Sequence, residues 1–133
     1  MRIEVHQLPP AELSPNARCP WVDKYRAGEV FAHAVYYSAV DVLNRSLVDR
    51  LRARPPTKAR VNVTFVFAQG RRRDRDNLVG MFKPGLDALV KVGLIQDDDA
   101  KHLELGEVKV EVDKGRAPLT IIELEEVNNV EKV

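Results

Sequence analysis

Five aspartates in two short segments are the residues whose types and spacing could do chemistry. Asp74 and Asp76 are separated by one residue, and Asp97, Asp98 and Asp99 follow further along the chain. In an extended segment, side chains two residues apart point to the same side. Carboxylate oxygens are the ligands that hard divalent cations prefer. The two segments therefore predict an oxygen-only site for such a cation, once the fold brings them together.

The kind of cation follows from the ligands that the sequence does not offer. A thiolate site is excluded because Cys19 is the one cysteine, and the three histidines are scattered without ligand spacing. Oxygen ligands alone favour Mg²⁺, for which Mn²⁺ would substitute. A structural interpretation stays open beside this one. Asp76 or Asn77 would serve as a helix N-cap, and a triple aspartate after a helix is typical of a solvated loop.

Positive charge gathers immediately before the first pair of aspartates, at Arg71, Arg72 and Arg73. The whole chain has a net charge of only +1. Residues 1–73 hold 13 Lys and Arg against 6 Asp and Glu, a net charge of +7, whereas residues 74–133 hold 8 against 14, a net charge of −6. This split suits a protein that holds a polyanion on a basic surface and a cation beside it.

Length and composition limit the class of protein. A chain of 133 residues, of which 44% are hydrophobic, is one domain's length and buries roughly two-thirds of the surface of its unfolded form. This composition excludes intrinsic disorder. No apolar run approaches the ~20 residues of a membrane span, and the first residues lack a secretory signal. We expect one soluble, cytoplasmic domain over residues 1–133, with a frayed tail at 128–133.

The first half of the chain predicts a strand, a loop and a long helix. Residues 1–7 alternate apolar and polar side chains, as in a strand. Residues 11–23 form an ordered loop. Trp21 in this loop could stack on a base, but a lone tryptophan beside prolines more often anchors such a loop to the core. Apolar residues then recur at three- and four-residue spacing over residues 24–54, which predicts an amphipathic helix. Its last turns carry three arginines, for which helix capping and phosphate contact both stay open: Arg50, Arg52 and Arg54.

The second half returns to strands around a second helix. Residues 60–68 form the clearest strand, and its two partly apolar faces place it inside the sheet. Residues 103–112 and 119–124 alternate again and predict a C-terminal hairpin. This order predicts an α+β fold, with a mixed β-sheet and a long helix and a second, shorter helix packed on one face.

The second helix contains Pro84, whose ring presses on the carbonyl group four residues back. That carbonyl belongs to Gly80, which has no side chain to add to the crowding. A kinked helix from Asn77 and a fresh start at Pro84 are both open. At the other end, Gly93 followed by Leu94 predicts a helix C-terminal stop with its hydrophobic contact.

Four motifs combine into one pattern in the middle of the chain. They are Arg73-Asp74-Arg75-Asp76-Asn77-Leu78, Lys83, Leu86-Asp87-Ala88-Leu89, and Gly93-Leu94-Ile95 with Asp97-Asp98. On these residues the sequence resembles the RusA family of Holliday junction resolvases, endodeoxyribonucleases of bacteria and their prophages. Leu13-Ser14-Pro15-Asn16-Ala17-Arg18 also resembles the segment that follows the family's first strand. The resemblance covers about residues 8–113.

The resemblance implies a set of site residues. The family's metal-binding aspartates fall on Asp74, Asp76 and Asp98, with Asp97 adjacent, and these would hold Mg²⁺. Counted back from Asp87, the family's catalytic lysine falls on Lys83, although counting forward from Asn77 would place it at Gly80. Lys83 is the only cation between Asp76 and Asp87. The alternative for Lys83 is an exposed helix residue.

The resemblance also implies a substrate and an assembly. A homodimer would bind branched double-stranded DNA at a four-way junction and make paired nicks, without a membrane or an organic cofactor. The DNA-binding residues would be Arg71, Arg72, Arg73, Arg75, Lys58, Arg60, Asn16 and Arg18, mainly through the phosphate backbone. Two alternatives stay open: a junction-binding protein with weak or no cleavage, and a magnesium-dependent nucleotide phosphohydrolase.

Overall fold

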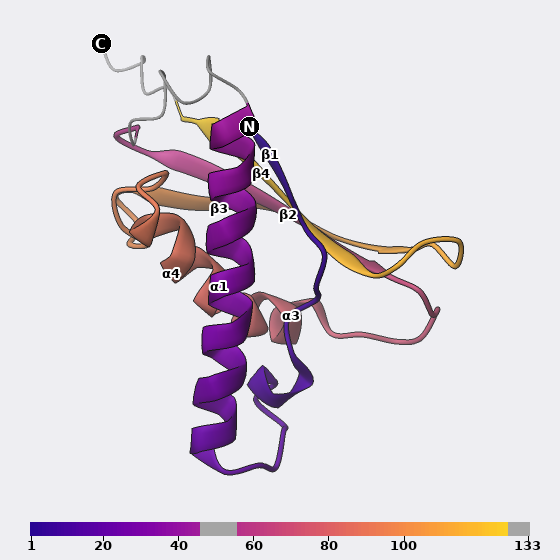
Figure 1. Cartoon of the computed structure of the whole chain (residues 1–133). Helices are drawn as coiled ribbons and strands as arrows, with labels where there is room; N and C mark the ends of the chain where they lie inside the picture. Colours follow the sequence, from indigo (N-terminus) through magenta and orange to yellow (C-terminus); the bar gives the residue numbers. More distant parts are fainter. Residues whose placement is uncertain (46–55, 128–133) are drawn as a thin grey trace.

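A computed structural model describes residues 1–45 and 56–127. The elements in chain order are β1 (Arg2–Val5), the 3-10 helix η1 (Ala11–Leu13), α1 (Trp21–Arg45), β2 (Ala59–Phe67), α3 (Arg75–Met81), α4 (Lys83–Lys91), β3 (Leu103–Val112) and β4 (Leu119–Glu126). Figure 1 shows α1 lying across a twisted sheet, with α3 and α4 beside it. The predicted α+β class, with its mixed sheet and its long and shorter helices, is confirmed.

The sheet has four strands in the order β1-β4-β2-β3. β2 runs antiparallel to β4 and parallel to β3, and β1 runs antiparallel to β4. β2 therefore lies inside the sheet, as its two partly apolar faces predict. A strand with neighbours on both sides has partners for all its backbone groups, which suits the most apolar strand.

The C-terminal hairpin is present, but β2 lies between its two strands. β3 and β4 follow each other through residues 113–118 and run in opposite directions, because β2 is parallel to one and antiparallel to the other. At the C-terminal end of β2, Phe67 is the register partner of Val112 in β3, and Val66 is the register partner of Leu119 in β4. The connection at residues 113–118 thus crosses the end of β2. β3 and β4 form their hydrogen bonds with β2, whereas in a simple hairpin they would form them with each other.

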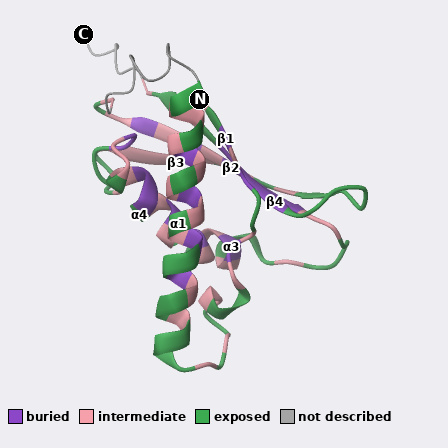
Figure 2. Ribbon diagram, viewed as in Figure 1, coloured by how far each residue is buried: buried purple, intermediate pink, exposed green. Residues whose placement is uncertain are grey.

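The core lies between the helices and one face of the sheet. Phe31, Val35 and Ala39 follow each other at four-residue spacing on α1, and all three are fully buried. They belong to one apolar cluster with Ile3 of β1 and Ile122 of β4. Figure 2 shows the buried positions of α1 alternating with exposed ones along its length. The apolar residues that recur at three- and four-residue spacing in the sequence therefore include those with which this helix contacts the core.

The second helix is interrupted at Phe82, and a new helix, α4, begins at Lys83. Of the two open alternatives, the structure therefore favours a fresh start beside Pro84 over a kinked helix that continues from Asn77. α4 begins at Lys83, so Pro84 occupies the first turn, where its missing N–H forfeits no helical hydrogen bond. The Phe82 ring is buried and meets the edges of Phe31 and Phe65, with centroids 6.1 and 6.0 Å apart. Burial of this aromatic side chain is what holds the two short helices at the break.

The predicted stop at the end of α4 is confirmed. Gly93 has a φ of +90°, and its N–H donates to the carbonyl of Val90 at 3.0 Å. The Leu94 N–H donates to the carbonyl of Leu89, also at 3.0 Å. These two bonds form a Schellman motif, which needs a left-handed residue that glycine supplies without strain.

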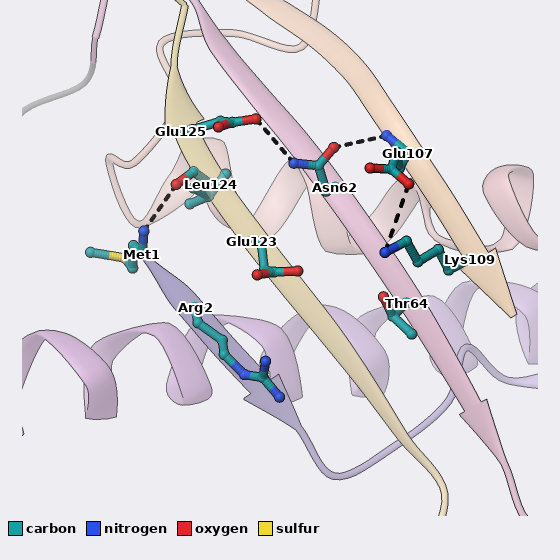
Figure 3. A pocket seen from close by; sticks show the side chains of 9 residues that line it. All are labelled: Met1, Arg2, Asn62, Thr64, Glu107, Lys109, Glu123, Leu124 and Glu125. Carbon is teal, nitrogen blue, oxygen red and sulfur yellow. Dashed lines mark hydrogen bonds and ion pairs between the residues drawn. The ribbon is translucent and has the colours of Figure 1, made fainter. Parts of the chain in front are cut away.

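The face of the sheet opposite the helices is largely polar, although Val66, Leu119 and Ile121 form a small buried apolar cluster on it. A hollow of about 450 Å³ lies there, lined by side chains of all four strands. Figure 3 shows these side chains from close by. Arg2 and Lys109 lie at its sides, together with Asn62 and the carboxylates of Glu107 and Glu123. Two-residue alternation along each strand separates this face from the core face.

Two predictions about the first half are wrong, and others lie outside the described residues. The long helix begins at Trp21 rather than at residue 24, so it includes the last three residues of the predicted loop. Trp21 does not anchor its loop to the core, because it begins α1 with 76% of its surface exposed, and its ring forms a T-shaped pair with Tyr25. The predicted end of the long helix, with Arg50, Arg52 and Arg54, falls on residues 46–55, and the predicted tail on residues 128–133. In the two described ranges, no helix is long and apolar enough to cross a membrane.

Candidate functional site

Asp74 and Asp76 lie at the start of α3, directly after the arginine run. Asp74 is the N-cap: its Oδ1 accepts hydrogen bonds from the N–H groups of Asp76 at 2.8 Å and Asn77 at 3.4 Å. The capping residue is thus Asp74, not Asp76 or Asn77 as the structural interpretation had it. Asp76 is exposed in the first turn, where its negative charge is favoured by the helix dipole.

The arginine run divides into two roles. The guanidinium of Arg73 lies 3.6 Å above the centre of the Phe67 ring, and its Nη1 donates to the carbonyls of Gln69 and Arg71. Partial burial and the neighbouring charge of Arg71 lower the pKa of Arg73. Arg73 therefore holds the turn between β2 and α3. Arg71 and Arg72 are exposed and remain available to an anion.

A hollow of about 530 Å³ joins this turn to the N-terminal segment of the chain. Its polar rim includes Arg71, Arg72 and Asp74, and Leu8 and Ser14 reach it from the other side. Two segments that are far apart in sequence, both singled out by the resemblance, therefore surround one depression. In the same N-terminal loop, Asn16 and Arg18 are exposed.

Lys83 and Asp98 form the closest contact among the predicted site residues. The Lys83 Nζ donates to Asp98 Oδ2 and, at 3.1 Å, to Asp87 Oδ1. The hydrogen bond to Asp98, followed by the one to Asp87, raises the pKa of Lys83, and the bond from Lys83 lowers the pKa of Asp98. Lys83 is therefore held as an ammonium group that donates to both Asp98 and Asp87.

The remaining aspartates of the second segment shape its loop. Asp97 Oδ1 accepts the N–H of Asp98 at 2.8 Å. Asp99 Oδ1 lies 2.6 Å from His102 Nδ1 and accepts the backbone N–H groups of Lys101 and His102. The contact with His102 lowers the pKa of Asp99. Asp97 and Asp99 thus fold this segment through short-range hydrogen bonds, so the solvated-loop interpretation is only part of their role.

The carboxylates form two separate groups. Asp74 and Asp76 share the start of α3, and Asp98 shares Lys83 with Asp87. Within residues 1–45 and 56–127, no three histidine, cysteine, aspartate or glutamate side chains come together as a group that could hold a metal ion.

Two of the predicted DNA-binding residues lie at the opposite end of β2 from the arginine run. Lys58 precedes the strand, and Arg60 is its second residue, pointing to the polar face. The Arg60 guanidinium donates to Glu104 at 2.5 Å and to Glu125 at 3.3 Å, and these bonds raise its pKa. Arg60 is therefore already engaged by two carboxylates.

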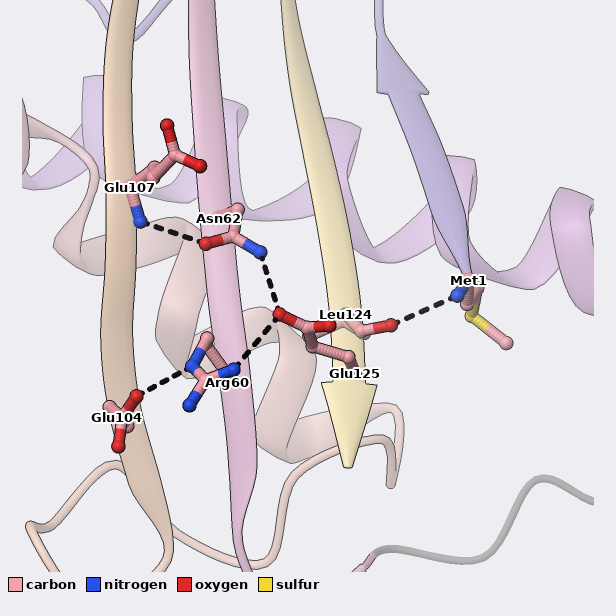
Figure 4. A network of polar contacts seen from close by, with 7 residues as sticks. All are labelled: Met1, Arg60, Asn62, Glu104, Glu107, Leu124 and Glu125. Atoms are coloured by element: carbon pink, nitrogen blue, oxygen red, sulfur yellow. Dashed lines mark hydrogen bonds and ion pairs between the residues drawn. The ribbon is translucent and has the colours of Figure 1, made fainter. Parts of the chain in front are cut away.

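Sequence reasoning missed the network around Arg60 and the part played by Asp87. Figure 4 shows Asn62 between two strands: its amide donates to Glu125 at 3.2 Å, and its Oδ1 accepts the Glu107 N–H at 2.8 Å. No periodicity reveals such a contact, because its members come from three strands. Asp87 served only as a landmark in the sequence, although its four-residue spacing from Lys83 is a detectable signal for a helical ion pair.

Neither a protein-family model nor a curated protein matches the chain.

Proposed function

We propose that this protein is a magnesium-dependent endodeoxyribonuclease that cleaves four-way DNA junctions as a homodimer. The observation that carries the proposal is the contact between Lys83 and Asp98. Two separate motifs of the RusA-like pattern single out these residues, and the fold brings their side chains together.

The hollow beside the arginine run supplies a second argument. Exposed Arg71 and Arg72 lie at its rim next to Asp74. Guanidinium groups bind phosphate oxygens in a bidentate fashion, and such contacts provide affinity without reading the base sequence. An enzyme that recognises the shape of a junction needs this kind of contact. Arg73 would assist indirectly, by holding the turn that carries its two neighbours.

The donor chemistry of the site fits Mg²⁺. Asp74, Asp76 and Asp98 would hold the ion, with Asp97 adjacent, and all of them offer carboxylate oxygens. When bound, the ion would supply Lewis acidity and a water of lowered pKa. The described residues do not gather these carboxylates into one group, and Asp98 is engaged by Lys83. Binding of the ion would therefore require Asp98 to exchange the Lys83 ammonium for Mg²⁺.

The protein's own groups have definite charges at neutral pH. The lowered pKa of Asp98 keeps its carboxyl ionised, and the raised pKa of Lys83 keeps its amine protonated. Lys83 would stabilise negative charge on the phosphate or on the leaving oxygen as a positioned point charge. A phosphate must compete for that ammonium with Asp87 and Asp98, so Lys83 would exchange carboxylate partners for DNA.

A cleavage assay on a synthetic four-way junction tests the proposal. The protein is incubated with the junction in Mg²⁺ or in a chelator, and a linear duplex of the same sequence serves as the control. We expect symmetrically paired nicks in the junction strands in Mg²⁺ only, and little cutting of the duplex. A protein that neither binds nor cuts the junction would contradict the proposal.

One observation favours a second candidate, a junction-binding protein with weak or no cleavage. The three proposed metal ligands do not form one group in the described part of the chain, and Lys83 is neutralised by two carboxylates. The basic rim of the hollow would still bind DNA. Salt-sensitive binding of the junction without nicking in Mg²⁺ or Mn²⁺ would favour this candidate.

A further inference from the structure

β3 forms one edge of the sheet and is long for an edge strand. It has ten residues, against four in β1 at the other edge. Among the described strands it pairs only with β2, and none of its residues is buried. The outer edge of such a strand presents backbone N–H and C=O groups that can pair with another chain.

A β-bulge interrupts the first half of this edge. Gly106 and Glu107 together oppose Asn62 of β2, because the register shifts between Val61 and Val63. The Asn62 side chain fills the irregularity by accepting the Glu107 N–H. Bulges end regular pairing and are one means by which proteins protect an edge. No such irregularity follows: from Val108 to Val112 every residue of β3 has a regular partner on β2.

The regular half of β3 alternates charged and apolar side chains. Lys109 and Glu111 point to the polar face of the sheet, where Figure 3 shows Lys109 beside Glu107. Val108, Val110 and Val112 share the other face, and Val112 is 47% exposed although it is an apolar β-branched residue. A strand of this composition fits the edge of another sheet better than it fits water.

We propose that residues 108–112 of β3 pair antiparallel with the same segment of a second copy of this chain, about a two-fold axis at Val110. In this register Lys109 lies opposite Glu111 of the second copy, and Val108 lies opposite its Val112. Opposite charges and apolar pairs that face each other directly stabilise an antiparallel ladder. The two sheets join into one of eight strands.

The charge pattern selects this register over its neighbours. A two-fold axis at Lys109 would place two lysines face to face, and a parallel in-register pair would do the same. An axis at Val108 would carry the ladder through the bulge at Gly106 and Glu107. The inference specifies the interface of the homodimer in the proposed function and rests on that proposal for the dimer itself.

Charge reversal and re-pairing test the interface without DNA. Dimerisation is measured by sedimentation velocity over a concentration series, with circular dichroism to verify folding. We expect Lys109→Glu to weaken the dimer by about tenfold or more, since it turns two attractive pairs into repulsive ones. The double variant Lys109→Glu, Glu111→Lys should restore the dimer. Lys101→Glu, outside the paired segment, is the matched control and should leave it unchanged.

A cross-link provides a second measurement with a control on the same strand. In a Cys19→Ser background, Val110→Cys should form an intermolecular disulfide under mild oxidation, because the two copies of this position face each other across the axis. Val112→Cys should not, since its two copies would lie about 13 Å apart along the strands. A wild-type chain that stays monomeric, or a dimer that Lys109→Glu leaves intact, overturns the proposal.

The outcomes separate this inference from the proposed function. A dimer that responds to the charge swap in a protein that never cuts junctions would support the interface and contradict the nuclease. Paired nicking by a dimer insensitive to the swap would support the nuclease and reject the interface.

Discussion

The ammonium group of Lys83 contacts the carboxylate of Asp98, fifteen residues further along the chain. Lys83 stands at the first turn of α4, and Asp98 lies in the loop that follows the Gly93 stop of that helix. The stop turns the chain back, so the loop returns to the start of the helix. This contact links the local helix signals to the proposed chemistry.

The Lys83–Asp98 contact predicts a pH effect. Because the folded-state pKa of Asp98 is lowered, its contribution to stability is complete above its unfolded value of about 3.9 and is lost as the pH falls through the lower folded value. Lys83→Gln should raise the Asp98 pKa toward the ordinary value and remove that contribution. Carboxyl-detected NMR titration measures the shift. Lys101→Gln is the control, and an unchanged Asp98 pKa in Lys83→Gln would contradict the contact.

Asp76→Asn should abolish magnesium-dependent cleavage of the junction and leave junction binding intact or tighter. The side chain is exposed and accepts no hydrogen bond from a described residue through its oxygens, so the amide should not disturb the fold. Cleavage and gel-shift assays on the same junction measure both properties. Glu123→Gln, on the opposite face of the sheet, should cut normally. Normal cutting by Asp76→Asn would remove its proposed role.

Asp74 has a structural function that separates two substitutions at one position. Asp74→Ala removes the N-cap of α3 and should lower the free energy of unfolding by about 1 kcal/mol. Asp74→Asn keeps an oxygen acceptor for the N–H groups of Asp76 and Asn77, so its stability should stay close to that of the wild type. Urea denaturation measures both. Equal losses in the two variants would show that the cap does not depend on this oxygen.

Two helical glycines should respond to alanine with opposite signs. A Cβ at Gly85 would lie 2.8 Å from the buried Phe82 ring and 3.2 Å from Phe31, whereas one at Gly80 meets nothing within 4 Å. Gly85→Ala should therefore destabilise the fold by about 1–2 kcal/mol, since overpacking outweighs the gain in helix propensity. Gly80→Ala should stabilise by up to about 1 kcal/mol. Thermal denaturation of the pair checks the packing at the helix break.

Alanine substitutions at Arg72 and Arg73 should have different effects, one on DNA binding and the other on stability. Arg72→Ala should weaken binding to all junction sequences alike and reduce the slope of log K against log salt by about 1. Arg73→Ala should instead lower the stability of the turn, because its guanidinium covers Phe67 and binds two carbonyl groups. Fluorescence anisotropy over a salt series and denaturation separate the two. Arg2→Ala, on the polar face, should leave the salt slope unchanged.

Local patterns in the sequence determined much of the secondary structure. The stripe of α1, the alternation of β2 and the stop at Gly93 all depend on neighbours within a few residues, so periodicity and glycine placement reveal them. The α+β class follows from their order. The same logic failed for Trp21, because whether a loop residue packs inward depends on what the rest of the chain offers it.

Only the tertiary structure decided the relations between distant segments. The insertion of β2 between β3 and β4 depends on which strand is most apolar once all are present. The break at Phe82 depends on its burial between Phe31 and Phe65, and the choice of Asp74 as the cap depends on where α3 begins. The sequence by itself determined the candidate carboxylates and cations. Their division into one group at Asp74 and another around Lys83 arises from backbone turns, whose geometry no residue spacing encodes.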